Sequence, residues 1–294
     1  MIPIRPRRSA LYMPGSNARA IEKAKTLAAD VVIFDLEDAV APDLKEQARD
    51  QVCAAVQAGG YGRRELVIRI NALESPWGAV DLAAAVAAAP DAILVPKVSS
   101  AETLAAVGLR LRKLGAAECT RIWAMIETPQ AILRAESIAS AAHDVDTRLS
   151  CFVLGTNDLA KDTRTRLLPG RAAMLPWLMT ALAAARAHGI DILDGVYNTL
   201  SDESGFRAEC EQGRDCGFDG KTLIHPDQIA AANGIFAPSE DEIESARAIV
   251  AAFEQPENRA KGAISLNGRM VERLHAEMAR RTLALAEAIS KQTT

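Results

Sequence analysis

The chain has 294 residues, of which 49% are hydrophobic and 24% charged, and its formal net charge is −4. This length allows one large barrel or two ordinary domains, and the balanced charge argues against a nucleic-acid-binding surface. No apolar run is long enough to span a bilayer, and the basic N-terminus lacks the apolar core of a signal peptide, so we expect no membrane partner.

The five cysteines are odd in number, and no two of them have the C-x-x-C spacing. This pattern does not indicate a disulfide framework or a zinc site. We therefore expect free thiols and a reducing, cytoplasmic setting.

Eight short apolar segments, each followed by a helix-like segment, recur up to residue 236. The predicted strands are residues 9–14, 31–37, 65–71, 92–98, 122–127, 151–155, 190–197 and 218–224. Eight strand–helix units predict an α/β fold of the (β/α)8 TIM barrel type. A doubly wound open sheet is the alternative, because short strands are easily miscounted.

The pattern changes after residue 236. Residues 238–254 predict a charged amphipathic helix, residues 258–268 an irregular segment with two glycines, and residues 270–291 a long helix. We expect no strand in this part of the chain. The predicted domains are thus a barrel over residues 1–236 and a C-terminal helical arm over residues 237–294, which packs on its own barrel or on a neighbouring subunit.

Charged and polar residues gather where the predicted strands end. They are Asp35, Glu37 and Asp38, Arg69 and Asn71, Lys97, Glu127, Asp158, Asp194, and Lys221 with His225. In a barrel of this type the chemistry takes place at the carboxyl ends of the strands. Polar groups that are half buried there must pair with one another or with a ligand.

Glu127 and Asp158 follow two neighbouring predicted strands, and together they predict a Mg²⁺ site. Carboxylate oxygens are the ligands that this hard cation prefers, and it keeps open positions for water and an oxyacid substrate. Each acid also has an ordinary explanation, because Glu127 favours a helix N-terminus and Asp158 could be an N-cap. The interpretation that both acids bind the metal is favoured because they lie at adjacent strand ends.

The other strand-end residues leave alternatives open. For Arg69, oxyanion binding is favoured over a purely structural ion pair. Glu37 and Asp38 either hold metal-bound waters or have a structural role, and Lys97 makes either a buried salt bridge or a substrate contact. Structural roles are favoured for the remaining residues of this kind, which are Asp35, Asp194 and, in a turn, His225.

The chain resembles the citrate lyase β-subunit-like acyl-CoA lyases of the HpcH/HpaI aldolase superfamily. The motifs that carry the resemblance are, in chain order, RRSALYMPGSN, FDLEDAVAPDLKEQAR, VIRIN, ILVPKV, IETPQAI, LGTNDLA, ILDGVY and GKTLIHPDQI. Members are Mg²⁺-dependent (β/α)8 barrels, commonly trimers or hexamers. They cleave or form carbon–carbon bonds in 3-hydroxyacyl thioesters such as malyl-CoA, citramalyl-CoA and citryl-CoA.

The resemblance also implies roles for individual residues. Glu127 and Asp158 match the metal ligands, Arg69 matches the arginine that grips the 2-oxoacid, and Glu37 and Asp38 match acids beside the metal waters. The family's C-terminal arm carries an aspartate over the active site of an adjacent subunit, and in the matching stretch NGRMVERLH this position is Glu272. We further expect the basic residues Arg7 and Lys221 to contact coenzyme A at the barrel mouth.

The sequence therefore predicts a Mg²⁺-dependent carbon–carbon lyase that cleaves a short 3-hydroxyacyl-CoA into acetyl-CoA and a 2-oxoacid, and that forms a homotrimer or hexamer. In this scheme Glu272 is a candidate base that takes the substrate hydroxyl proton. Four alternatives remain: a malyl-CoA thioesterase, an aldolase that does not need coenzyme A, a citrate lyase β subunit that depends on a carrier protein, and a non-catalytic barrel.

Overall fold

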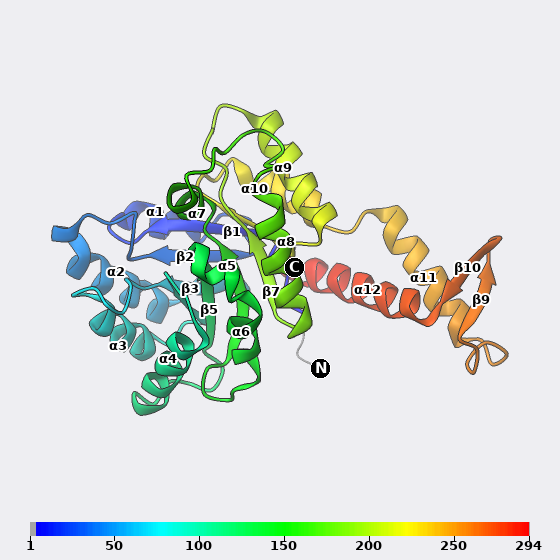
Figure 1. Cartoon of the computed structure of the whole chain (residues 1–294), viewed down its shortest axis with the longest axis horizontal. Helices are drawn as coiled ribbons and strands as arrows, with labels where there is room; N and C mark the ends of the chain where they lie inside the picture. The colour runs from blue at the N-terminus through cyan, green and yellow to red at the C-terminus, as the bar shows by residue number, and fades with distance from the viewer. Residues whose placement is uncertain (1–3, 294) are drawn as a thin grey trace. The chain divides into compact units, whose positions relative to one another are not determined.

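Eight parallel strands close into a barrel in the computed structural model, which describes residues 4–293 (Figure 1). The strands are β1 (Ser9–Pro14), β2 (Val31–Asp35), β3 (Glu65–Arg69), β4 (Ala92–Val95), β5 (Arg121–Ile126), β6 (Leu149–Leu154), β7 (Asp191–Asp194) and β8 (Gly220–Leu223). Each strand pairs in parallel with the next, and β8 pairs with β1. The predicted barrel is confirmed, and the pairing of β8 with β1 excludes the open sheet.

Helices follow the strands and cover the outside of the barrel. They are α1 (Ala18–Ala24), α2 (Lys45–Ala58), α3 (Gly78–Ala88), α4 (Ala101–Lys113), α5 (Pro129–Leu133), α6 (Ala135–Ser140), α7 (Thr156–Thr163), α8 (Leu175–Ala187), α9 (Glu203–Cys216) and α10 (Gln228–Phe236), with short 3₁₀ turns at η1 (Pro42–Leu44) and η2 (Ala141–His143). Local signals set several starts, because the side chains of Asn17, Ser100 and Thr128 accept hydrogen bonds from the first turns of α1, α4 and α5.

Apolar side chains fill the barrel interior in alternation along each strand. The interior cluster consists of Ala10, Val31, Ile33, Val67, Ala92, Leu94, Trp123, Met125, Cys151, Val153 and Leu193, with Tyr12 packed against it. Successive side chains of a strand point to opposite faces. The residues two positions beyond this cluster, Asp35 on β2 and Arg69 on β3, therefore also face the interior, at its carboxyl end.

Arg7 lies at the amino end of the barrel. Its guanidinium donates to Glu65 and to Asp191, each at 2.7 Å, and lies 4.7 Å from the centre of the Trp123 ring. Glu65 and Asp191 are the first residues of β3 and β7. The expectation that Arg7 contacts coenzyme A at the barrel mouth is wrong, because its side chain is buried at the opposite end from Arg69.

The chain divides into two compact units, one of residues Arg7–Asn233 and one that contains the chain from Gly234 onward. The second unit includes α11 (Glu240–Glu254) and α12 (Arg273–Thr293), which pack against each other. Its apolar core consists of Phe253, Ile264, Val271 and Ala276.

A hairpin of two antiparallel strands, β9 (Ala263–Leu266) and β10 (Arg269–Glu272), precedes α12. The prediction of an irregular segment running directly into a helix at residue 270 is therefore wrong. The turn residues Asn267 and Gly268 have positive φ values of 50° and 75°. Such backbone angles are what a two-residue Asn-Gly turn between antiparallel strands requires.

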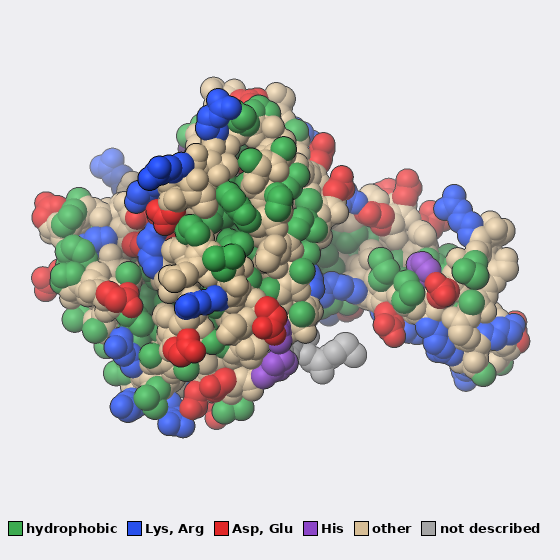
Figure 2. Space-filling view, in the orientation of Figure 1, with side chains coloured by type: hydrophobic (Ala, Val, Ile, Leu, Met, Phe, Trp, Pro, Cys, Tyr) green, Lys and Arg blue, Asp and Glu red, His purple; other side chains and the backbone are tan. Residues whose placement is uncertain are grey.

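No helix within residues 4–293 is long and apolar enough to cross a membrane. Acidic and basic side chains are interspersed over the face of the molecule seen in Figure 2.

The five cysteines are free, as predicted.

The charged plug at the amino end of the barrel predicts a large loss of stability on removal of Arg7. Arg7→Met removes the guanidinium that bonds both Glu65 and Asp191, and breaking a buried ion pair in this way costs about 3–5 kcal/mol. Urea unfolding measures the loss. The matched control is Arg112→Met, because the Arg112 side chain is 63% exposed in its pair with Asp146, and exposed pairs contribute about 1 kcal/mol or less. Equal losses in the two variants would contradict the structural assignment of Arg7.

Candidate active site

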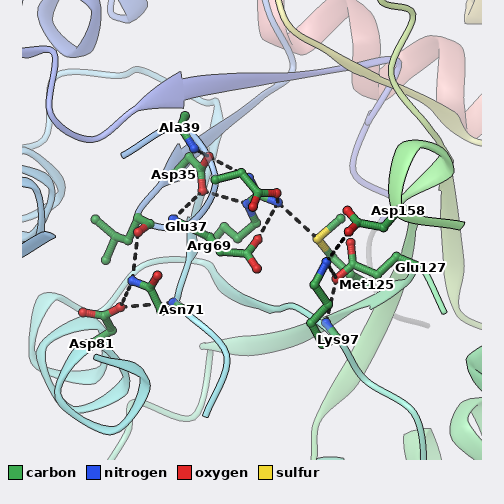
Figure 3. Close-up of polar contacts among 12 residues, drawn as sticks. Asp35, Glu37, Ala39, Arg69, Asn71, Asp81, Lys97, Met125, Glu127 and Asp158 are labelled. Carbon is green, nitrogen blue, oxygen red and sulfur yellow. Dashed lines mark hydrogen bonds and ion pairs between the residues drawn. The ribbon is translucent and has the colours of Figure 1, made fainter. Parts of the chain in front are cut away.

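Charged side chains from neighbouring strand ends meet at the carboxyl end of the barrel (Figure 3). Asp35 and Arg69 end β2 and β3, and Lys97 lies two residues after β4. Glu127 directly follows β5, and Asp158 stands in the first turn of α7, just after β6. The structure thus brings together these five of the residues that the sequence predicted to converge.

Asp35 is held from two sides. Arg69 Nε and Nη2 donate to its two carboxylate oxygens, each at 2.7 Å, and the backbone N–H groups of Glu37 and Ala39 donate at 2.8 and 3.0 Å. Burial opposes ionisation of Asp35, but the guanidinium and the N–H donors outweigh it and hold the pKa of this carboxyl below its usual value. The structural role favoured for Asp35 is confirmed.

Arg69 has one edge left for the site after pairing with Asp35. Its Nη1 lies 2.8 Å from Glu37 Oε2 and 3.3 Å from Asp38 Oδ2, and the guanidinium lies 4.9 Å from the centre of the Tyr12 ring. The residue is 6% exposed. The structure therefore shows the ion-pair role of Arg69, and oxyanion binding by the Nη1 edge stays a prediction.

Glu37 is a buried acid with an unusual proton affinity. Burial raises its pKa to about 7, and the charges of Asp38 and Glu127 add to this effect, while Arg69 and Lys97 oppose it. A carboxyl with a pKa near neutrality can exchange a proton at physiological pH.

The loop that carries Glu37 is held by Lys45, whose role the sequence did not reveal. The Lys45 ammonium donates to the carbonyl oxygens of Leu36 and Glu37, at 2.8 and 2.7 Å. The only sequence feature that could have indicated this role is the spacing of Lys45 from Glu37 in the motif FDLEDAVAPDLK.

The Lys97 ammonium lies close to the carboxylates of both Glu127 and Asp158. Lys97 Nζ is 2.7 Å from Asp158 Oδ1 and 3.5 Å from Glu127 Oε1, and the backbone N–H of Lys97 donates to Glu127 Oε1 at 2.7 Å. The Glu127 side chain is fully buried, and burial, with the charge of Asp158, raises its pKa. Within residues 4–293, Glu127 Oε2 is buried and has no hydrogen-bond partner.

Gly155, directly after β6, makes room for the Glu127 carboxylate. A Cβ at this position would lie 2.4 Å from Glu127 Cβ and 2.5 Å from Glu127 Oε2, closer than real atoms approach. The sequence offered only a weak signal for this role, a glycine between a strand and a helix.

The residues present fit a divalent cation. Five carboxylates, those of Asp35, Glu37, Asp38, Glu127 and Asp158, face three cationic side chains, Arg69, Lys97 and Lys45, so positive charge is in deficit. The unpartnered Glu127 Oε2 is a hard oxygen donor. No cluster of three or more Asp, Glu, His or Cys side chains in the described part of the chain can hold a metal ion by itself. A cation here would therefore take further ligands from water or substrate, as Mg²⁺ commonly does.

Lys221 belongs to a separate network on the outer side of the barrel wall. Its ammonium lies 2.8 Å from Asp194 and 2.7 Å from Glu209 on α9, and Arg171 bonds the other oxygen of Asp194 at 2.7 Å. Because Leu193 faces the interior, Asp194 faces the helix layer. Lys221 is fully buried, so the predicted contact with coenzyme A is wrong. The structural role of Asp194 is confirmed.

Asn71 and His225 make local contacts. The Asn71 amide donates to Leu36 O and to Asp81, at 2.8 and 2.6 Å, which joins the end of β3 to α3. His225 Nδ1 accepts from the backbone N–H of Asp227 at 3.3 Å, which agrees with its predicted role in a turn.

Glu272 is the last residue of β10, in the C-terminal unit. Its backbone N–H donates to His275 Nδ1 at 3.0 Å, and its side chain is partly exposed. Its predicted role in catalysis stays a prediction.

Comparisons with known proteins show close relatives. A (3S)-malyl-CoA thioesterase from Cereibacter sphaeroides is 52% identical over 285 residues, which cover 97% of this chain and 96% of the relative. Citrate lyase subunit β from Escherichia coli is 38% identical over 288 residues, which cover 96% of this chain and 94% of the relative. Among solved structures, protein CitE from Mycobacterium tuberculosis in complex with magnesium, acetoacetate and coenzyme A is 28% identical, with a TM-score of 0.75 over 97% of this chain and 100% of that one.

A family model described as HpcH/HpaI aldolase/citrate lyase matches residues 8–226. This segment contains all eight strands of the barrel and the site residues Asp35, Arg69, Lys97, Glu127 and Asp158. The resemblance inferred from the motifs is confirmed, and the chain belongs to the HpcH/HpaI aldolase/citrate lyase family.

Proposed function

We propose that the protein is a Mg²⁺-dependent enzyme that hydrolyses the thioester of a short 3-hydroxy-3-carboxyacyl-CoA of the malyl-CoA type. One observation carries the choice of hydrolysis: the 52% identity with a (3S)-malyl-CoA thioesterase, which extends over almost the full length of both chains. The geometry at the carboxyl end of the barrel supports this chemistry, because it combines two carboxylates suited to a cation with a cationic edge and a carboxyl that titrates near pH 7.

Glu127 and Asp158 are the residues that would hold the cation. When bound, Mg²⁺ supplies positive charge that orients the carboxylate and hydroxyl oxygens of the substrate and polarises the bond to be cleaved. Charge deficit at this end of the barrel supports the proposal, as does the unpartnered Oε2 of Glu127.

Arg69 would stabilise negative charge that develops on the substrate oxygen. Its fork is fixed by Asp35, so the Nη1 edge is held in place before the substrate arrives. Donors fixed in this way need no reorganisation during the reaction, and removing one typically costs about 10²–10³ in rate.

Glu37 would act on the attacking water. Its carboxylate accepts a proton as the water oxygen bonds to the thioester carbon, and the carbon–sulfur bond then breaks. The proton passes from Glu37 to the departing thiolate, so the products are the free hydroxy-dicarboxylic acid and coenzyme A. A pKa of about 7 suits a group that must both accept and return a proton.

Carbon–carbon cleavage is the second candidate, and the relationship to citrate lyase subunit β favours it. The same cation site and Arg69 edge would serve it, and Glu272 from a neighbouring copy would take the hydroxyl proton. The products would then be acetyl-CoA and glyoxylate instead of malate and coenzyme A. An aldolase independent of coenzyme A, or a carrier-dependent subunit, would leave free malyl-CoA unchanged.

The products decide between these reactions. We expect purified protein with Mg²⁺ and (3S)-malyl-CoA to release coenzyme A and malate in equal amounts, with no glyoxylate, as measured by chromatography. EDTA should abolish the reaction, and Glu127→Gln should lower kcat about 10²-fold or more because the cation loses a ligand. Stoichiometric glyoxylate and acetyl-CoA would select the lyase, and full activity of Glu127→Gln would reject the cation site in both schemes.

The raised pKa of Glu37 predicts a pH-dependent stability. The folded state binds this proton more tightly than the unfolded chain, so the stabilisation is complete below the ordinary glutamate pKa and is lost as the pH rises through about 7. Between pH 5 and pH 8, in EDTA, the wild type should lose about 2 kcal/mol of unfolding free energy relative to Glu37→Gln. Urea unfolding at several pH values measures this difference, and a constant difference would contradict the assignment.

Mixed oligomers test the proposed role of Glu272 in a neighbouring copy. In the carbon–carbon cleavage scheme, Glu272→Gln and Glu127→Gln should each be nearly inactive, because one lacks the base and the other a cation ligand. If Glu272 acts in a second subunit, unfolding and refolding the two variants together should restore part of the activity, because some sites then combine intact residues from two chains. Refolding each variant alone is the control. A mixture no more active than its components would rule out this arrangement.

A further inference from the structure

The ammonium of Lys97 lies where the two proposed cation ligands converge. It is 2.7 Å from Asp158 Oδ1 and 3.5 Å from Glu127 Oε1, and Figure 3 shows it directed toward both carboxylates. An ammonium and a divalent cation compete for the same carboxylate oxygen atoms. They cannot both stay in contact with the same pair of carboxylates without strong repulsion.

Lys97 contacts Glu127 through its backbone N–H and through its side-chain ammonium. Its φ is +54°, in the left-handed region that non-glycine residues rarely adopt. This conformation directs the Lys97 N–H to Glu127 Oε1 at 2.7 Å, while the side chain extends to Asp158. The N–H fixes one oxygen of Glu127, and the ammonium compensates the charge of the pair.

The two parts of this arrangement differ in their freedom to move. Glu127 is completely buried, whereas the Lys97 side chain is 35% exposed and that of Asp158 is 27% exposed. Lys97 can therefore withdraw its ammonium toward solvent without opening the core. The backbone hydrogen bond from Lys97 to Glu127 does not depend on the position of the ammonium.

We infer that Lys97 is an exchangeable internal counter-ion: its ammonium neutralises Glu127 and Asp158 until a divalent cation displaces it. This inference rests on the proposed cation site. Each binding event would replace one positive charge with two, so the affinity for the cation is set by competition with the protein's own side chain. The displaced ammonium stays tethered at the edge of the site, where it adds positive charge for a carboxylate-bearing substrate.

Chemical labelling of the wild-type protein tests the exchange directly. A brief pulse of acetic anhydride, followed by mass spectrometry, reports how free each lysine amine is. Saturating Mg²⁺ should increase the acetylation of Lys97 severalfold and leave that of Lys161, an exposed lysine on α7, unchanged. Acetylation of Lys97 that is unchanged or reduced by Mg²⁺ would overturn the inference.

Cation affinity provides the second test, with Mn²⁺ binding followed by electron paramagnetic resonance. Lys97→Met removes the competing charge but keeps a side chain of similar length, so Mn²⁺ should bind about tenfold more tightly or better. Lys161→Met removes the same charge nearby without a contact to either ligand, and should change the affinity about threefold at most. Lys97→Gln serves in the same test should Lys97→Met fail to fold.

The outcomes separate the inference from the function on which it rests. Glu127→Gln should lose Mn²⁺ binding at this site. If it binds as tightly as the wild type, the cation site and the exchange both fail. If Glu127→Gln loses binding but removal of the Lys97 charge has no more effect than Lys161→Met, the exchange alone is wrong.

Discussion

The carboxyl end of the barrel gathers more carboxylates than cationic side chains, and three of these acids, Asp35, Glu37 and Glu127, are buried. Asp35 is fully paired, because the fork of Arg69 and two backbone N–H groups satisfy it. The remaining acids share the Nη1 edge of Arg69 and the ammonium of Lys97. Burial raises the pKa of Glu37, the neighbouring carboxylates add to this effect, and one oxygen of Glu127 has no partner within the described residues. A folded chain maintains such an arrangement only where the surrounding structure enforces it, which is typical of functional sites.

The two ends of the barrel differ in how completely their charged side chains are paired. At the amino end, Arg7 binds Glu65 and Asp191 directly and packs over Trp123, so this end is closed and stabilising. At the carboxyl end, the pairing is incomplete and part of the charge is exposed to solvent. This division agrees with the general behaviour of such barrels, in which one end supports stability and the other chemistry.

The barrel was predictable from the sequence because the strand–helix pattern is repeated eight times, so an error in one repeat does not change the predicted fold. Even the bounds of β1 agree with the prediction, and the convergence of Arg69, Glu127 and Asp158 follows from parallel strands ending at one rim. Orientation was harder to predict. The placement of Arg7 could have been inferred, since a residue just before β1 lies at the amino end, whereas the outward direction of Lys221 depends on the alternation along two short strands. The hairpin replaces the predicted irregular segment, although Asn267-Gly268 is a strong turn signal.

Gly155 has a consequence for how the family diversifies. Its missing side chain is what allows the Glu127 carboxylate to lie against the end of β6. Any other residue would push that carboxylate away even though both acids remained in the sequence. A single substitution at Gly155 would therefore displace a proposed cation ligand without changing either acid. The glycine is thus a sequence marker for relatives in which this glutamate can take the position seen here.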